Sequence, residues 1–238
     1  MNPALLLGRI QISQYSYYLR DLIHKNSQNK LFSEGLIIYQ RFFEDSFLNE
    51  LNHYTVFDDY NFSSARKVIS ETDTKRVLLK INKVIEEKIK PYLGKNLYCT
   101  EYHMLTLGNK TSTDGSYQPH HDYKGRRVKI FIWVNNSKEK THPLYYLQGS
   151  QKKLKIWNTY EQTRFKNTLE DEMFKFSGKK GDMALFDTHG IHSHFKKTTG
   201  VRSVIKLVFE NFGFNYRLSD RSLKGKEYLK KCKAIKID

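Results

Sequence analysis

The sequence predicts a mainly β fold with flanking helices (α+β), a double-stranded β-helix or jelly roll braced by helices on one face. Helical patterns dominate the chain up to about residue 95, and about eight short strand patterns follow them. Turn-rich breaks separate those strands, at Asp114-Gly115, at Lys124-Gly125 and from Gly178 to Gly181. Short strands in close succession pair into two packed sheets, and helices that precede them can cover one outer face.

Four elements are predicted in the first part of the chain. Apolar residues at helical spacing predict a short helix within 12–26, and the β-branched and aromatic run 36–39 predicts a strand. Capping residues followed by apolar ones predict a helix over about 44–51. The longest helix should begin near Asp73 and end before Pro91. Its apolar stripe consists of Val77, Leu78, Ile81, Val84, Ile85 and Ile89.

From residue 97 onward the pattern is that of short strands rich in β-branched and aromatic residues. The predicted strands are 97–107, 127–134, 143–148, 153–157, 173–176, 182–187 and 201–209. The segment after Arg221 is basic and should end in a short helix from Lys226 to Ile235. We expect one domain, with a helical part at about 1–95, a jelly-roll core at about 96–212 and a basic C-terminal helix at about 221–238.

Composition narrows the class of protein without choosing its partner. Aromatic residues make up 14% of the 238 residues, enough to fill a core. Lys and Arg total 41 against 25 Asp and Glu, and a formal net charge of +16 favours an acidic metabolite, nucleic acid or a membrane surface. Simple solvation by lysine explains the same surplus equally well. There is no apolar run long enough for a membrane span and no signal-peptide pattern, and Cys99 and Cys232 have no disulfide or zinc spacing, so we expect a cytoplasmic protein.

The segment from Gln118 to Tyr123 contains the spacing His-x-Asp, at His120 and Asp122. On an extended chain these two side chains point to the same face, while His121 points away. Two histidines and one carboxylate occupy three positions of an octahedral metal and leave three open, which is the ligand set of non-haem iron(II) oxygenases. A 2-oxo acid can chelate two of the open positions and O₂ can take the third.

A second histidine must come from further along the chain, and the segment 181–194 offers His189, His192 and His194. Arg202 follows His192 by ten residues and opens the predicted strand 201–209. A guanidinium can grip a carboxylate through two hydrogen bonds, so it suits the distal carboxylate of 2-oxoglutarate. This combination is far more specific than the His-x-Asp motif alone.

The same residues resemble the phytanoyl-CoA dioxygenase (PhyH-like) family of Fe(II)/2-oxoglutarate-dependent oxygenases, over about Leu36 to Phe209. Leu36 to Leu51 is similar to the opening strand and helix of that family. Leu144 to Gln151 is similar to its small-residue turn, with Gln151 in place of the usual histidine. Gly181 to His192 matches its Gly-Asp-x-x-x-Phe run, in which the metal histidine follows the Phe by six residues.

The resemblance implies a cupin-like jelly roll that holds Fe(II) through His120, Asp122 and His192, rather than through another histidine. It implies 2-oxoglutarate as co-substrate, bound by Arg202, with Trp133 lining its site. The expected reaction is hydroxylation of a small molecule, such as a lipid or acyl thioester, a sugar derivative or a natural-product intermediate. Halogenating relatives replace the aspartate with a small residue, and Asp122 is retained.

Other interpretations stay open. Trp133 and Lys129 fit a plain core position as well as a site wall, and three residues of the strand 97–107 are candidates to face the site: Tyr102, His103 and Thr106. The chain could also be a jelly-roll binding protein without turnover. A basic protein that stacks single-stranded nucleic acid on aromatic side chains is a further alternative, although nucleic acid is the less favoured partner.

Overall fold

The computed structural model describes residues 23–24, 27–51, 64–108, 119–122, 127–136, 142–152, 170–194, 200–211 and 229–238, and two antiparallel sheets dominate it. The larger sheet has the strand order β1-β7-β4-β9-β3-β10, with β2 also paired to β3, and the smaller sheet has the order β6-β5-β8. The strands are β1 (Leu36–Tyr39), β2 (Ser64–Val68), β3 (Leu97–Leu107), β4 (Val128–Trp133), β5 (Leu144–Tyr146), β6 (Phe174–Phe176), β7 (Met183–Asp187), β8 (His192–Ser193), β9 (Arg202–Asn211) and β10 (Ile235–Ile237).

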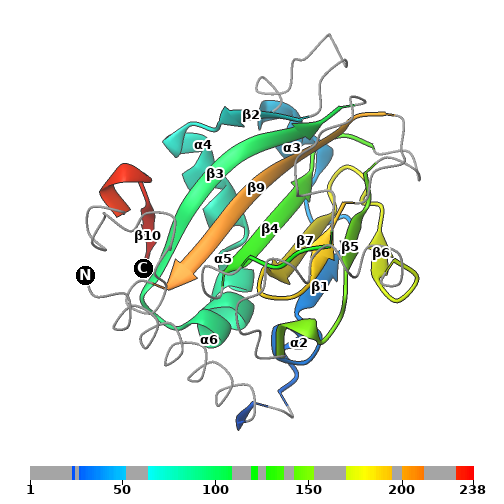
Figure 1. Ribbon diagram of the computed structural model, residues 1–238. Coiled ribbons are helices and arrows are strands. Elements are labelled where there is room, and N and C mark those ends of the chain that lie inside the picture. Colours follow the sequence, from blue (N-terminus) through cyan, green and yellow to red (C-terminus); the bar gives the residue numbers. More distant parts are fainter. Residues whose placement is uncertain are drawn as a thin grey trace.

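Helices cover one face of the larger sheet, as Figure 1 shows for α4, α5 and α6. The helical elements are α2 (Lys30–Ser33), α3 (Asp45–Leu51), α4 (Glu71–Lys80), α5 (Asn82–Val84), a π-helical turn (Ile85–Ile89), α6 (Lys90–Leu93) and a 3₁₀ turn (Ser150–Lys152). The Ser70 side chain caps α4 by accepting a hydrogen bond from the backbone of Asp73. The prediction that this helical segment ends before Pro91 is wrong. Pro91 lies in the first turn of α6, where its missing N–H has no partner to lose.

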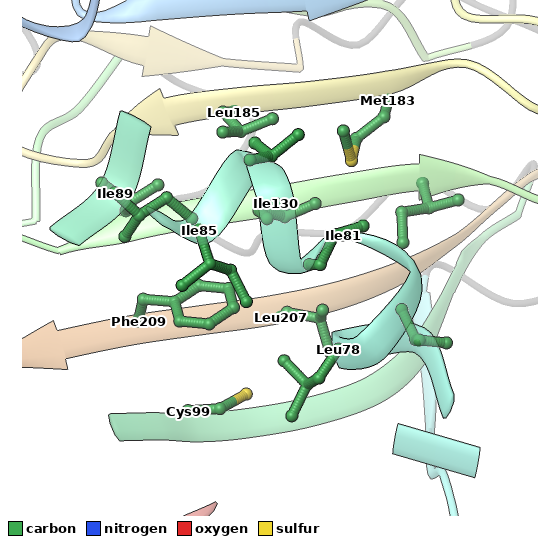
Figure 2. Packing of buried hydrophobic residues seen from close by; sticks show 14 of the residues in the cluster. Leu78, Ile81, Ile85, Ile89, Cys99, Ile130, Met183, Leu185, Leu207 and Phe209 are labelled. Carbon is green, nitrogen blue, oxygen red and sulfur yellow. The ribbon is translucent and has the colours of Figure 1, made fainter. Parts of the chain in front are cut away.

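The predicted apolar stripe of the long helix is confirmed and forms the first core. Its side chains pack against the helix-facing side of the sheet, and Figure 2 shows Ile81, Ile85 and Ile89 next to Ile130 and Leu185. All five are buried. The apolar stripe of a helix and the alternating apolar positions of a strand therefore account for this layer together.

A second core fills the space between the two sheets. Because side chains alternate along a strand, Phe131 and Trp133 of β4 point away from the helices and into this core. We call this side of the larger sheet the inner face; its apolar side chains include Leu105, Phe131, Trp133, Phe186 and Val204. They pack against Leu144, Tyr146 and Phe176 of the smaller sheet. The Trp133 and Phe176 rings, one from each sheet, lie 5.1 Å apart.

Several predicted elements match closely and others do not. Strands 36–39 and 97–107 have the predicted bounds, whereas the helix in 12–26 and the strand 153–157 lie almost wholly or wholly outside the described residues. The prediction that the C-terminal helix runs to Ile235 is wrong: residues 229–231 are helical, and Ile235–Ile237 form β10, which pairs with the start of β3. Strands β2 and β8 were not predicted. In the described part of the chain, every helix is too short or too polar to cross a membrane.

Candidate metal centre

The structure brings His120, Asp122 and His192 together, although 70 residues separate the last two in the sequence. One potential ligand atom from each side chain lies within 4.8 Å of the others. His120 and His192 form an isolated antiparallel bridge, with backbone hydrogen bonds of 3.0 and 2.8 Å in the two directions. Their rings lie 4.4 Å apart. Backbone pairing with β8 therefore sets the relative position of the two imidazoles.

The hydrogen bonding of His192 leaves one ring nitrogen suited to a metal. Its Nδ1 lies 2.9 Å from the carbonyl oxygen of Gly190, and a carbonyl can only accept, so Nδ1 carries the proton. The lone pair is then on Nε2, which is buried and has no hydrogen-bond partner. Burial, followed by the proximity of His120, holds the pKa of His192 well below its usual value, so the ring is neutral. A neutral imidazole with its other nitrogen tied to a carbonyl is the form that ligates metals.

Asp122 is held as a carboxylate by two cations. Burial alone would raise its pKa, but Lys129 and Arg127 outweigh this effect and hold the pKa well below the usual range. Lys129 Nζ lies 2.9 Å from Asp122 Oδ2, and Arg127 donates a hydrogen bond to the same oxygen. The backbone N–H of Asp122 donates to the carbonyl of Thr188 at 2.7 Å. These contacts fix the carboxylate and its charge.

A network centred on Asp187 orders the turn that leads from β7 to His192. Asp187 Oδ2 accepts a 2.6 Å hydrogen bond from the Tyr92 hydroxyl, and Oδ1 accepts one of 2.8 Å from the backbone of His189. The Tyr146 hydroxyl donates to the Asp187 carbonyl at 3.0 Å. A side chain at Gly190 would overlap the Tyr146 ring, so only glycine fits there. The helices, the turn and the smaller sheet thus orient the histidine together.

The two rival histidines, His189 and His194, lie outside the group of three, and so does His121. The ring of His189 packs 5.8 Å from that of His121, which agrees with the prediction that His121 points away from His120 and Asp122. Burial is the main cause that holds the pKa of His194 well below its usual value, and the nearby Arg202 and His120 lower this pKa further. Of the histidines that the structure describes, only His120 and His192 meet a carboxylate in a metal-sized group.

Arg202 begins β9 and is 1% exposed, so it is not an ordinary surface arginine. Its guanidinium donates to the carbonyl of His142 and lies 5.7 Å from the centre of the Phe131 ring. Because Leu107 lies opposite Arg202 in the sheet, the side chain starts on the inner face.

Trp133 is fully buried between the sheets and is a core residue. Its indole Nε1–H is buried without a hydrogen-bond partner, which is costly for a donor unless a ligand satisfies it. Gly178 allows the indole to fit, because a side chain at that position would overlap the ring. Both interpretations of Trp133, as core and as site wall, are therefore compatible with its position.

Gln151, at the position where the PhyH-like family usually has a histidine, has a structural role. It is buried, and its Nε2 donates to the carbonyls of Leu31 and Phe32 in α2, at 3.3 and 3.2 Å. The preceding Ser150 accepts a 2.8 Å hydrogen bond from the backbone of Ile191, directly before His192. The turn thus supports the site through its serine and the helix through its glutamine.

Charged residues of the inner face were largely missed by the sequence reasoning. Lys206 lies opposite both Phe131 and His103 in the sheet, so His103 is on the inner face, whereas Tyr102 packs in the helix-facing core. Thr106, like Tyr102, lies on the helix-facing side by alternation and bonds Ser203 at 3.0 Å. We call the following set the inner-face cluster: Glu101, His103, Arg127, Lys129, Lys206 and Glu210. One signal could have pointed to it, the single lysine in the apolar run 204–209.

Comparison with known proteins supports the fold. No protein-family model and no curated protein matches the sequence. HygX from Streptomyces hygroscopicus, solved with nickel and 2-oxoglutarate bound, matches with a TM-score of 0.56 and 18% identity, over 80% of this chain and 90% of HygX. The epimerase SnoN, solved with Fe³⁺, alpha-ketoglutarate and nogalamycin RO, gives 0.52 and 13%, over 80% and 84% of the two chains. EvdMO1 gives 0.53 and 16%, over 76% of this chain and 48% of its own. This chain has the jelly-roll fold of these proteins.

Proposed function

We propose that this protein is an Fe(II)- and 2-oxoglutarate-dependent oxygenase of the PhyH-like type that hydroxylates a small organic molecule. One observation carries the proposal: the buried, unpaired Nε2 of His192 lies in a group of ligand atoms with His120 and Asp122. A neutral imidazole nitrogen left without a partner in the interior is unfavourable unless a ligand takes it. Two imidazoles and one carboxylate are the set that iron(II) oxygenases use.

The three side chains would divide the work of holding the metal. His192 would bind through Nε2, because its Nδ1 is tied to Gly190. Both ion pairs of Asp122 use Oδ2, so Oδ1 is the oxygen that would ligate the ion. His120 would complete the set, since its ring lies beside that of His192. Arg127 and Lys129 would keep the carboxylate ionised and oriented.

Arg202 and Trp133 would hold 2-oxoglutarate. The guanidinium would pair with the carboxylate that is distant from the metal, at a position where burial strengthens the interaction. The Trp133 Nε1–H, which lacks a partner, could donate to the same ligand. HygX and SnoN were solved with 2-oxoglutarate or alpha-ketoglutarate bound, which favours this co-substrate for a chain of the same fold.

When bound, iron and 2-oxoglutarate would supply the oxidation of a C–H bond by O₂, with one oxygen atom entering the substrate and the other entering the succinate that forms with CO₂. The protein would orient the substrate and exclude other reductants. Structures of HygX and SnoN contain bound hygromycin B and nogalamycin RO, which supports a small organic molecule as the substrate of a chain with this fold. Retention of Asp122 favours plain oxidation over halogenation.

The test is anaerobic addition of Fe(II) and 2-oxoglutarate, followed by visible spectroscopy and by succinate release on exposure to air. A weak charge-transfer band should appear and should be lost in His120→Ala. His121→Ala is the matched control, because this neighbouring histidine packs on His189 and lies outside the group of three. Arg202→Gln should keep iron binding but require far more 2-oxoglutarate to produce the band.

The outcomes separate the alternatives. A band without succinate release would favour a jelly-roll binding protein without turnover. No band in the unaltered protein, or an equal loss in His120→Ala and His121→Ala, would refute the metal assignment.

A further inference from the structure

The inner-face cluster places buried charge next to the candidate metal site. Lys206 is 7% exposed, and its Nζ lies 2.8 Å from Glu101 Oε2. Arg127, which also binds Asp122, lies 3.6 Å from Glu101 and 3.5 Å from Glu210. The cluster therefore extends without interruption from a candidate metal ligand to the middle of β3 and β9. Charged groups this deep in a fold are costly, so their presence calls for a reason other than packing.

His103 is the member of the cluster that faces Lys206 across the sheet, and it carries a buried polar atom without a hydrogen-bond partner. The residue is 9% exposed, and its buried Nε2 has no hydrogen-bond partner. It faces Lys206 directly across the sheet, with Glu101 two residues away on the same face of β3. Burial, and then Lys206, lowers the pKa of His103 to about 3. The ring is therefore neutral at pH 7 and can form a hydrogen bond with a ligand as an uncharged group. An ammonium and an imidazole nitrogen thus lie side by side, and the imidazole nitrogen lacks a partner.

Charge balance indicates which kind of group this part of the inner face would accept. Under the proposed function, the charges of Fe(II), Asp122, 2-oxoglutarate and Arg202 cancel. The remaining inner-face charges, within the described residues of β2, β3, β4 and β9 and directly before β4, are four cations and two carboxylates. The cations are Arg66, Arg127, Lys129 and Lys206, and the carboxylates are Glu101 and Glu210. Arg66 is exposed at the sheet edge, opposite Leu105, so the excess of positive charge extends to the surface.

We propose that Lys206, His103 and Glu101 form the substrate subsite of this oxygenase and that the subsite takes an anionic group of the substrate, a phosphate or a carboxylate. The proposal rests on the proposed function and adds a substrate class to it. The ammonium of Lys206 pairs with the anion, and His103 Nε2 donates a hydrogen bond to it. Glu101 holds Lys206 in place until the anion binds. An unsubstituted apolar chain would leave these groups buried and unmatched.

Isothermal titration calorimetry with three matched probes tests the proposal: glycerol 3-phosphate, glycerate and glycerol. The titrations use the anaerobic protein with Fe(II) and 2-oxoglutarate, whose loading the visible band reports, and also the metal-free protein. We expect at least one anion to bind about tenfold or more tightly than glycerol, the effect of a charge-assisted hydrogen bond. The better of the two anions identifies phosphate or carboxylate as the group. Because the cluster belongs to the chain itself, anion binding stays measurable even if the band never forms, so the two proposals fail separately.

Variants connect the binding to the named residues. Lys206→Met combined with Glu101→Gln removes the ammonium without leaving a carboxylate unpaired, and it should weaken anion binding about tenfold. Glu101→Gln alone releases the ammonium from its partner and should strengthen binding. His103→Phe should weaken it by about fivefold. Lys67→Met is the control, because Lys67 lies on β2 opposite Met104, which packs in the helix-facing core, so this variant removes a positive charge from outside the inner face, whereas the double variant leaves the net charge unchanged.

Three results would overturn the proposal. They are equal affinities for glycerol and both anions, weaker anion binding in Glu101→Gln, and a loss in Lys67→Met as large as in the double variant. If buried variants do not fold, Arg66→Gln at the exposed edge gives the answer. It should weaken anion binding by about threefold and leave glycerol unaffected, and an unchanged anion affinity would count against the subsite.

Discussion

The hydrogen bond from Tyr92 to Asp187 should couple the stability of the fold to the geometry of the metal site. Both oxygens of Asp187 accept hydrogen bonds, one from the Tyr92 hydroxyl and one from the backbone of His189. The 2.6 Å distance to the Tyr92 hydroxyl is typical of a charge-assisted hydrogen bond to a carboxylate. Tyr92→Phe removes the hydroxyl and keeps the ring, which packs edge-on to Phe32.

The size of the effect follows from the type of bond. A hydrogen bond to a charged group contributes about 1.5–3 kcal/mol, and for a chain of 238 residues each kcal/mol lowers Tm by roughly 2–4 °C. Tyr92→Phe should therefore lower Tm by roughly 3–12 °C. Because Asp187 also holds the backbone of the turn before His192, the variant should in addition weaken Fe(II) binding. Calorimetric unfolding and an anaerobic iron titration measure the two effects.

Tyr102→Phe provides the comparison. Its hydroxyl donates to the backbone carbonyl of Lys233 at 3.1 Å, a bond between neutral groups on the helix-facing side of β3. Such a bond contributes about 0.5–1.5 kcal/mol, so Tm should fall by roughly 1–6 °C with no change in iron affinity. A Tyr92→Phe protein that loses no more stability than Tyr102→Phe, and binds iron normally, would refute the role assigned to Asp187.

Two further substitutions distinguish structural from functional roles. Gly178→Ala should force the buried Trp133 indole to move, lower stability by about 1–3 kcal/mol and weaken 2-oxoglutarate binding, and unchanged thermal unfolding would contradict this. Gln151→Leu leaves two carbonyls of α2 without their donor and should cost about 1–3 kcal/mol while the Fe(II)/2-oxoglutarate band stays intact. The exposed Gln148→Leu is the control for it, and a lost band in Gln151→Leu would show that the glutamine acts at the site.

Local patterns predicted the elements whose structure depends on neighbours in sequence. The strand 97–107 and the helical stripe from Val77 to Ile89 were readable because one periodicity continues over the whole element. The end of the helical segment was misjudged because a π-helical turn precedes Pro91 and lets the helix continue. Strand β10 lies where the sequence predicts a helix, because its pairing with Leu97 to Cys99 is non-local and nothing in the basic C-terminal segment indicates that partner.

The candidate site likewise has a part that local sequence patterns predict and a part that depends on non-local strand pairing. The spacing of His120 and Asp122 is local and was predictable, and the resemblance selected His192 from three histidines. The cations on Asp122 and the inner-face cluster depend on strand register, which the sequence does not contain. The place of Lys206 on the inner face follows only from its neighbours across the sheet, which are His103 and Phe131.

Strand register also explains how one interior could serve two anions. Arg202 and Lys206 lie on the same face of β9, four residues apart, which corresponds to roughly 13 Å along a strand. Val204 lies between them, beside Trp133 and Leu105, so the two cations arise from backbone positions on either side of an apolar residue. The arrangement therefore favours separate positions for the distal carboxylate of 2-oxoglutarate and for a charged group of the substrate, with Asp122 nearer to the second, because Arg127 contacts both Asp122 and Glu101.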